Sequence, residues 1–420
     1  MNNDIKGKII CLADGIDSSS NDEWVTVACS IKNNQKVSYN DMVNNLKLIY
    51  KELLTRFPQF RLKLSVINNL RYWVLLDIED CPFEELIKTV GLPNDKIPEI
   101  PIDELPIWRL NITEVEDNKV RFLFSCSHSL IDGRSVFTIL ELFINIAENN
   151  KISEDFLKAE NLPLTNSFKK KELFTKEICE EDIKIPDSWK KLQKCKLYPE
   201  VKQPYHFINI QHDFDYAPVS KFNRKYNFTC QALMMAIAER TLRKYHKGKI
   251  DDLPLAILCP ANTRLSKYAT ENYKKGIFFN AAGHQLIFIN RQNSLMEDIK
   301  HCKEELIKVS NTNESCVAFC YEEGFVDKVK KEIKIDEETP NFLDHNLVYA
   351  NNIGKICVGR EDITIRYIPN ENECFIGSFC YNNGKTWSVI SVYPDDIEKE
   401  FVNIMNESLI EVVNLIKNDK

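Results

Sequence analysis

Apolar side chains recur along the chain with two different spacings, which together predict a mixture of helices and strands. Residues 40–56 carry apolar positions three and four residues apart and end before Pro58, so they predict a helix with one buried face. A similar stripe over residues 134–148 predicts a second helix. Asp132 stands where its carboxylate can cap the start of that helix.

Short runs rich in β-branched and aromatic residues predict strands in the first half of the chain. Two pairs of runs are separated by only a few turn-forming residues, which indicates two antiparallel hairpins. These runs begin at Phe60, Arg71, Trp108 and Val120. The last of them ends at HSLIDG (128–133), so this segment is expected to connect a strand to the helix over 134–148.

The second half of the chain has the same mixed character. Helical spacing predicts helices over residues 229–246, 294–308 and 396–417. Strand-like runs cover residues 206–214, 253–264, 284–290, 346–354, 363–369, 374–384 and 386–394. No fixed-period repeat is present, so solenoid and propeller folds are not expected.

Residues 149–204 differ from both halves because they are rich in Lys, Glu, Asp and Pro and lack sustained periodicity, apart from a possible helix at 189–195. We therefore expect an α+β chain with an N-terminal lobe over 1–165, a linker or crossover over 166–204 and a C-terminal lobe over 205–420. The 420 residues are 44% hydrophobic, which is enough to bury a core in each lobe.

Charge and composition narrow the class of partner. The formal charge of −7 does not provide the basic surface that a nucleic-acid-binding protein needs. No window reaches the roughly 18 apolar residues of a membrane-spanning helix. The first residues do not resemble a secretory signal, and the 14 cysteines form no Cys-x-x-Cys pair. We expect a cytoplasmic protein that binds a small molecule, without a metal ion.

His128 is the strongest candidate for chemistry. It follows an apolar strand and precedes an Asp-Gly step at the start of a helix, and such strand ends can present a side chain to a ligand. An imidazole has a near-neutral pKa, so it can take a proton from a nucleophile and return it to a leaving group. A core histidine held by backbone hydrogen bonds fits residues 127–133 equally well.

The segment HSLIDG resembles the His-x-x-x-Asp-Gly signature of the chloramphenicol-acetyltransferase-like superfamily. That superfamily includes alcohol acetyltransferases, plant BAHD acyltransferases, wax-ester synthases and nonribosomal condensation domains. Four other segments are similar to family segments and occur in the same order: LLTRFPQFRLKL (53–64), LPIWRLNI (105–112), PANTR (260–264) and NNIGKI (351–356). The joint order favours a catalytic His128.

The resemblance implies two chloramphenicol-acetyltransferase-like lobes, each a mixed and mostly antiparallel sheet with packed helices, and an active-site tunnel between them. It implies that His128 is the general base for acyl transfer from a thioester to a hydroxyl or amine. Asp132 would pair with Arg264 and fix the loop of the histidine. Gly133 would permit close packing or a positive φ, and its backbone N–H is a candidate oxyanion donor.

The resemblance also implies that acyl-CoA is a co-substrate and that no cofactor is needed, with a small or lipid-like acceptor. Two departures from the family's sequence patterns narrow the choice of branch within the superfamily. The Asp-Phe-Gly-Trp-Gly segment of plant BAHD enzymes is absent, and Ser127 stands where wax-ester synthases and many condensation domains have a first histidine. By elimination, alcohol acetyltransferases are nearest, so O-acyl transfer is favoured over N-acyl transfer.

Two alternatives remain at this point. One is a catalytically inactive relative that binds an acyl group or a carrier protein as a scaffold. The other is a condensation enzyme that takes its substrate from a carrier protein. Serine-hydrolase elbows, Walker loops, Gly-x-Gly-x-x-Gly and His-Glu-x-x-His motifs are all absent from the sequence, so the reactions that depend on them are not expected.

Overall fold

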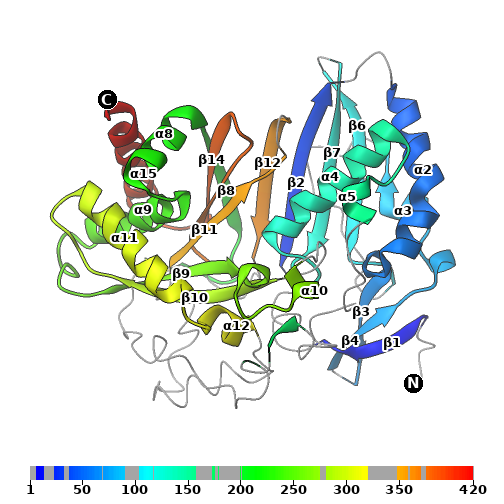
Figure 1. Ribbon diagram of the computed structural model, residues 1–420, viewed down its shortest axis with the longest axis horizontal. Coiled ribbons are helices and arrows are strands. Elements are labelled where there is room, and N and C mark those ends of the chain that lie inside the picture. Colours follow the sequence, from blue (N-terminus) through cyan, green and yellow to red (C-terminus); the bar gives the residue numbers. More distant parts are fainter. Residues whose placement is uncertain are drawn as a thin grey trace. The chain divides into compact units, whose positions relative to one another are not determined.

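The chain forms two compact units, each built from β-sheet with packed helices (Figure 1). The computed structural model describes residues 6–13, 23–32, 37–68, 70–89, 104–116, 118–157, 173–175, 178, 199, 201–274, 281–319, 348–357, 360–369 and 375–419. The first unit comprises Met1–Glu180, Lys267–Ala281 and Arg360–Ile368, and the second comprises Glu181–Ser266, Ala282–Gly359 and Pro369–Lys420. The predicted α+β class is confirmed. Each unit is discontinuous in sequence, whereas the sequence pattern predicted contiguous lobes.

Two sheets form the first unit. The larger has the strand order β12-β2-β7-β6-β5, and the smaller has the order β1-β4-β3. The strands are β1 (Lys8–Leu12), β2 (Trp24–Lys32), β3 (Leu62–Ile67), β4 (Leu70–Leu75), β5 (Ile87–Lys88), β6 (Trp108–Val115), β7 (Lys119–Ser127) and β12 (Glu361–Ile368). The two predicted hairpins are confirmed as the antiparallel pairs β3–β4 and β6–β7.

The helices α2 (Tyr39–Arg56) and α4 (Gly133–Asn149) confirm the two helices predicted in this half. Ser38 caps α2 through a capping box with Asp41. Shorter helical segments are η1 (Pro58–Arg61), η2 (Ile78–Asp80), α3 (Phe83–Leu86), α5 (Glu154–Leu157) and α10 (Glu271–Lys274). The possible helix at 189–195 lies outside the described residues, as does most of the predicted linker.

Aromatic side chains bind α4 to the larger sheet. The ring of Trp108 lies 5.5 Å from that of Phe143 on α4 and 6.1 Å from that of Phe124 on β7. The indole Nε1 of Trp108 donates a 2.9 Å hydrogen bond to the backbone oxygen of Phe60. Each fully buried aromatic side chain contributes about 1.5–3 kcal/mol to the free energy of unfolding because apolar surface is removed from water. This cluster therefore holds α4 against β6 and β7.

Strand β12 belongs to the first unit although it comes from the last quarter of the sequence. It pairs antiparallel with β2 over Thr364–Ile368 and at Glu361, and Figure 1 shows it in orange beside the blue β2. Arg360, which precedes β12, makes hydrogen bonds of 3.2 and 3.0 Å with the two carboxylate oxygens of Glu148 on α4. The start of β12 is thereby fixed to the helix that begins at the HSLIDG segment.

The second unit contains one six-stranded sheet of order β10-β9-β11-β13-β14-β8, in which β11 runs parallel to both of its neighbours. Its strands are β8 (Phe207–Asp215), β9 (Leu255–Asn262), β10 (Ala282–Ile289), β11 (Val348–Lys355), β13 (Gly377–Asn382) and β14 (Thr386–Pro394). Its helices are α8 (Tyr216–Tyr226), α9 (Cys230–Tyr245), η5 (Thr263–Leu265), α11 (Leu295–Ser310), α12 (Glu314–Phe319) and α15 (Lys399–Asn418). The three predicted helices are confirmed as α9, α11 and α15.

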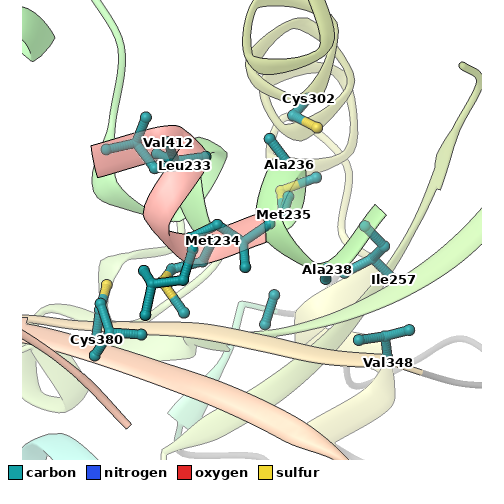
Figure 2. Packing of buried hydrophobic residues seen from close by; sticks show 14 of the residues in the cluster. Leu233, Met234, Met235, Ala236, Ala238, Ile257, Cys302, Val348, Cys380 and Val412 are labelled. Carbon is teal, nitrogen blue, oxygen red and sulfur yellow. The ribbon is translucent and has the colours of Figure 1, made fainter. Parts of the chain in front are cut away.

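Helix α9 lies at the centre of the hydrophobic core of this unit (Figure 2). Leu233, Met234 and Met235 are fully buried on it, in the same cluster as Val412 of α15 and Cys302 of α11. The sheet contributes the other side of the cluster through Ile257, Val348 and Cys380. Among the described residues, no helix combines the length and apolar character needed to cross a membrane.

A polar cavity of about 470 Å³ lies beside α9 in the second unit. Its lining residues are Glu239, Arg240, Arg243, Lys244, Lys247, Gly248, Asp251, Arg291, Gln292, Asn293, Ser294, Leu295 and Asp298. The charged groups pair with one another or with α15: Arg240 contacts Asp298 at 3.0 Å, and Arg240 and Lys244 both contact Glu411. Glu239 pairs with Arg243 inside the protein. This network joins α9 to α11 and α15.

Glu239 should make stability depend on pH. Burial and the neighbouring Asp298 raise the pKa of Glu239 to about 7, although Arg243 opposes the shift. In the unfolded chain this carboxyl has its ordinary pKa of about 4.5, so between the two pKa values the folded protein binds more protons and its free energy of unfolding falls as pH rises. We expect urea unfolding to show that the free energy of unfolding falls by up to about 3 kcal/mol between pH 4.5 and pH 7. Glu239→Gln should remove this pH dependence. Glu407→Gln, which changes an exposed glutamate of α15, is the control and should keep the wild-type slope.

Gly283 on β10 should not tolerate a side chain. A Cβ at this position would overlap the backbone oxygen of Ser315, and it would lie 2.6 Å from Cγ2 of Thr263. Because the backbone of Ser315 cannot rotate away, Gly283→Ala should lower the free energy of unfolding by about 1–3 kcal/mol. Asn290→Ala, at an exposed position after the same strand, should change it by less than about 0.5 kcal/mol. Equal free energies of unfolding for the two variants in urea would contradict the predicted overlap of a Cβ at Gly283 with the backbone of Ser315.

Candidate active site

The HSLIDG segment forms a tight connection between a strand and a helix, as the sequence predicted. Strand β7 ends at Ser127, a turn covers residues 128–130, and α4 begins at Gly133. The turn is closed by two hydrogen bonds to Ser127: the backbone N–H of Ser129 donates to its Oγ at 3.3 Å, and that of Leu130 donates to its carbonyl oxygen at 3.1 Å. Ser127 therefore has a structural part in presenting the histidine.

His128 is half-buried, although Ser127 and Ser129 on either side are 1% and 2% exposed. Its backbone N–H donates a 2.9 Å hydrogen bond to the carbonyl oxygen of Glu23, the residue before β2. The centroid of its imidazole ring lies 5.8 Å from the centroid of the Tyr367 ring on β12, and the two ring planes make an angle of 74°. The imidazole is thus held on one side and is not enclosed in the hydrocarbon core.

Asp132 caps α4, which confirms the capping role predicted from the sequence. Its Oδ1 accepts hydrogen bonds from the backbone N–H groups of Arg134 at 3.0 Å and Ser135 at 2.6 Å. Its Oδ2 accepts a 2.9 Å hydrogen bond from the backbone N–H of Ala281, a buried residue of the first unit. Asp132 is 4% exposed, so one buried carboxylate joins the turn, the helix and a distant segment.

The other two predicted site residues, Gly133 and Arg264, lie in helical segments of different units. Gly133 is the first residue of α4, and it is not among the described glycines with a positive φ; the sequence-based suggestion of a positive φ is therefore wrong. Arg264 lies in η5 of the second unit, where its Nε donates a 3.0 Å hydrogen bond to Oδ1 of Asn262. Asp132 and Arg264 belong to different units, and their pairing stays a prediction.

Two residues beside His128 were missed by the sequence analysis. Glu23 accepts the backbone bond of His128, and its carboxylate Oε2 accepts a 2.7 Å hydrogen bond from the hydroxyl of Tyr367. The run WVTVACSIK (24–32) has the β-branched composition of a strand and could have located Glu23 at a strand start. Nothing in the local sequence indicates that Tyr367 reaches the histidine.

Within the described part of the chain, His, Cys, Asp and Glu side chains form no cluster of three or more that could hold a metal ion. The described polar groups around His128 are its imidazole, the backbone N–H groups at the start of α4 and the hydrogen-bonded side chains of Glu23, Asp132 and Tyr367. An arrangement of this kind can move a proton and stabilise a developing negative charge.

No family model and no curated protein matches the sequence. Solved structures do match over almost the whole chain. The epimerization domain from the third module of tyrocidine synthetase B matches with a TM-score of 0.66 and 11% identity, over 99% of this chain and 99% of that one. Polyketide synthase associated protein 5 from Mycobacterium tuberculosis matches with a TM-score of 0.65 and 10% identity, over 97% and 98%.

A variant of the starter condensation domain of rhizomide synthetase, solved in complex with C8-CoA and Leu-SNAC, is also similar. It has a TM-score of 0.64 and 8% identity, and the match covers 97% of this chain and 90% of that one. Identities of this size relate folds and not activities. The chain therefore has the fold of the condensation domains, which is the chloramphenicol-acetyltransferase-like fold predicted from its sequence.

Proposed function

We propose that the chain is an acyltransferase that moves an acyl group from a thioester to a hydroxyl or amine, with His128 as the general base. The observation that carries this proposal is the partly exposed imidazole of His128 at a rigid strand-to-helix turn. The condensation-domain fold supports it, and in this chain the HSLIDG motif follows directly after strand β7. A purely structural histidine would not need to be partly exposed at this position.

The proposed reaction has two proton transfers and one bond exchange. His128 takes the proton of the acceptor hydroxyl as its oxygen attacks the thioester carbonyl carbon. The tetrahedral oxyanion then collapses, the carbon–sulfur bond breaks, and the protonated imidazole returns the proton to the departing thiolate. One imidazole can serve both steps because it is neutral before the first transfer and positively charged before the second.

The thioester class of the donor is supported by the complex of the rhizomide starter condensation domain with C8-CoA and Leu-SNAC, both named as ligands of that protein. We propose acyl-CoA as the co-substrate, with no cofactor. The acceptor is a small or lipid-like molecule. A hydroxyl acceptor is favoured over an amine because eliminating the plant BAHD branch and the branches with a doubled histidine leaves alcohol acetyltransferases as the nearest branch.

Asp132, Gly133 and Arg264 support the base in this proposal. Asp132 holds the turn through the helix cap and through Ala281, and its predicted partner Arg264 would complete the support. The cap bonds of Asp132 go to the N–H groups of Arg134 and Ser135, so they do not use the N–H of Gly133. That N–H, at the positive end of the α4 dipole, is a candidate donor to the oxyanion.

A carrier-protein donor is the second candidate. It is favoured by the origin of the structural neighbours, which include domains of tyrocidine synthetase and rhizomide synthetase. The same likeness to an epimerization domain also shows that this fold carries more than one reaction. A scaffold without catalysis is the remaining alternative, and the next experiment separates the three.

The test measures release of free thiol from a panel of acyl-CoAs in the presence of alcohol and amine acceptors. We expect turnover with the native protein and a decrease in kcat of about 10²–10⁴-fold for His128→Ala, because general-base catalysis is lost. His206→Ala changes an exposed histidine of the second unit and should retain turnover within about twofold. Thiol release that survives in His128→Ala would rule out His128 as the base.

The donor classes give different outcomes in the same assay. Turnover with acylated carrier protein and none with acyl-CoA would replace the proposed donor by the carrier donor. No turnover with either, together with binding of acyl-CoA or carrier protein in calorimetry, would support the scaffold. Each result therefore favours one candidate over the other two.

Asp132 should contribute more to stability than an ordinary helix cap. Asp132→Ala removes the cap of α4, worth about 1 kcal/mol, and leaves the buried N–H of Ala281 without this acceptor, which costs about 1–3 kcal/mol more. Ser38→Ala removes only the cap of α2 and should cost about 1 kcal/mol. Asp132→Asn keeps one oxygen and should be intermediate. Equal losses for Asp132→Ala and Ser38→Ala in urea unfolding would show that the Ala281 bond contributes little.

A further inference from the structure

Three strand ends meet beside His128. Trp24, the first residue of β2, is opposite Ser127 of β7 on one side and Ile368 of β12 on the other. The residues that adjoin these positions, Glu23, His128 and Tyr367, are therefore brought together by strand register. This arrangement depends on the addition of β12 to the sheet, because β12 alone carries Tyr367 to this edge.

We propose that Tyr367, held by Glu23, is a positioning residue that fixes the orientation of the His128 imidazole. The proposal rests on the proposed function, in which that imidazole transfers the proton. Tyr367 donates a 2.7 Å hydrogen bond from its hydroxyl to Oε2 of Glu23, while its ring lies 5.8 Å from the imidazole with an angle of 74° between the planes. Glu23 also accepts the backbone N–H of His128 through its carbonyl oxygen.

Glu23 thus contacts both ends of the arrangement. Its backbone carbonyl fixes the position of the His128 backbone, and its carboxylate fixes the position of the Tyr367 ring. A hydrogen bond from a phenol to a carboxylate is stronger than one between neutral groups, and it restricts both side-chain torsions of the tyrosine. A tyrosine ring that cannot rotate provides a fixed wall, and edge-to-face contact between aromatic rings favours one orientation of the histidine.

The strand that carries Tyr367 is itself anchored at its other end. Arg360 binds both carboxylate oxygens of Glu148, and Lys119 of β7 contacts Asp362 at 2.6 Å. These contacts lie at the opposite end of β12 from Tyr367, so the strand is held along its length. A small displacement of a reacting group lowers the rate of a positioned reaction strongly, which is why a fixed wall beside the base has a catalytic effect.

The main test compares two variants that each remove one hydroxyl from β12. Tyr367→Phe removes the hydrogen bond to Glu23 and keeps the ring, while Thr364→Val changes an exposed residue on the opposite face of the strand. We expect kcat for thiol release to fall about tenfold in Tyr367→Phe with KM for acyl-CoA within about twofold, because orientation and not binding is affected. Thr364→Val should match the native protein in both constants.

A second readout does not depend on turnover. The chain has seven histidines, and the imidazole signals of His128 in ¹H–¹⁵N NMR spectra are identified by their loss in His128→Ala. Tyr367→Phe should shift and broaden these signals, and Thr364→Val should leave them unchanged. Glu23→Gln, which retains an acceptor oxygen for Tyr367, should be closer to the native protein than Glu23→Ala in both kcat and spectrum.

The outcomes separate this proposal from the proposed function. Native kcat and an unshifted imidazole signal in Tyr367→Phe, together with inactive His128→Ala, would overturn the positioning role and keep the base. Full activity in His128→Ala would remove the base, and the spectra alone would then decide whether Tyr367 orients the ring. If Tyr367→Phe does not fold, as judged by its thermal transition, Glu23→Gln and Glu23→Ala decide the same question.

Discussion

Strand β12 pairs with β2 from Glu361 opposite Ser30 to Ile368 opposite Trp24, and the candidate site depends on this pairing. Without it, β2 would be an edge strand and Tyr367 would not reach His128. The cost of closing so long a loop grows only slowly with its length, so a strand more than 300 residues away in sequence can join the sheet once its hydrogen bonds and ion pairs form. The ladder with β2 and the contacts of Arg360 with α4 supply these interactions.

Support for the histidine thus comes from both near and distant segments. The turn is closed locally by Ser127 and capped by Asp132, and these contacts are made within a few residues of the histidine. Ala281 and Tyr367 reach the same region from distant parts of the sequence. In the proposed reaction the imidazole exchanges a proton with two partners and has to keep its orientation through both steps, and contacts from several segments restrict the site more than a turn alone.

Local patterns predicted most of the fold, and contacts between distant segments were not predictable. The stripe over 134–148, the cap at Asp132 and the two hairpins each depend on neighbouring residues, and each is confirmed. Helix α8 was missed because Pro218 near its start interrupts a short amphipathic pattern. The place of β12 was not foreseeable, since its sequence shows a strand but does not specify its partner. For the same reason, the sequence yielded His128 but not Glu23 or Tyr367.

Ser127 stands directly before His128, at the position where wax-ester synthases and many condensation domains have a first histidine by the sequence resemblance. Its side chain is 1% exposed and its Oγ accepts the backbone N–H of Ser129, so the position is used to close the turn. A histidine there would be larger than the buried serine and would lack the hydroxyl that accepts the N–H of Ser129, so the turn would have to change. One imidazole must then carry both proton transfers of the proposed reaction. A single base depends more on a fixed orientation than one of two histidines would, so in the proposed reaction the hydrogen bond between Glu23 and Tyr367 would have a chemical role as well as a structural one.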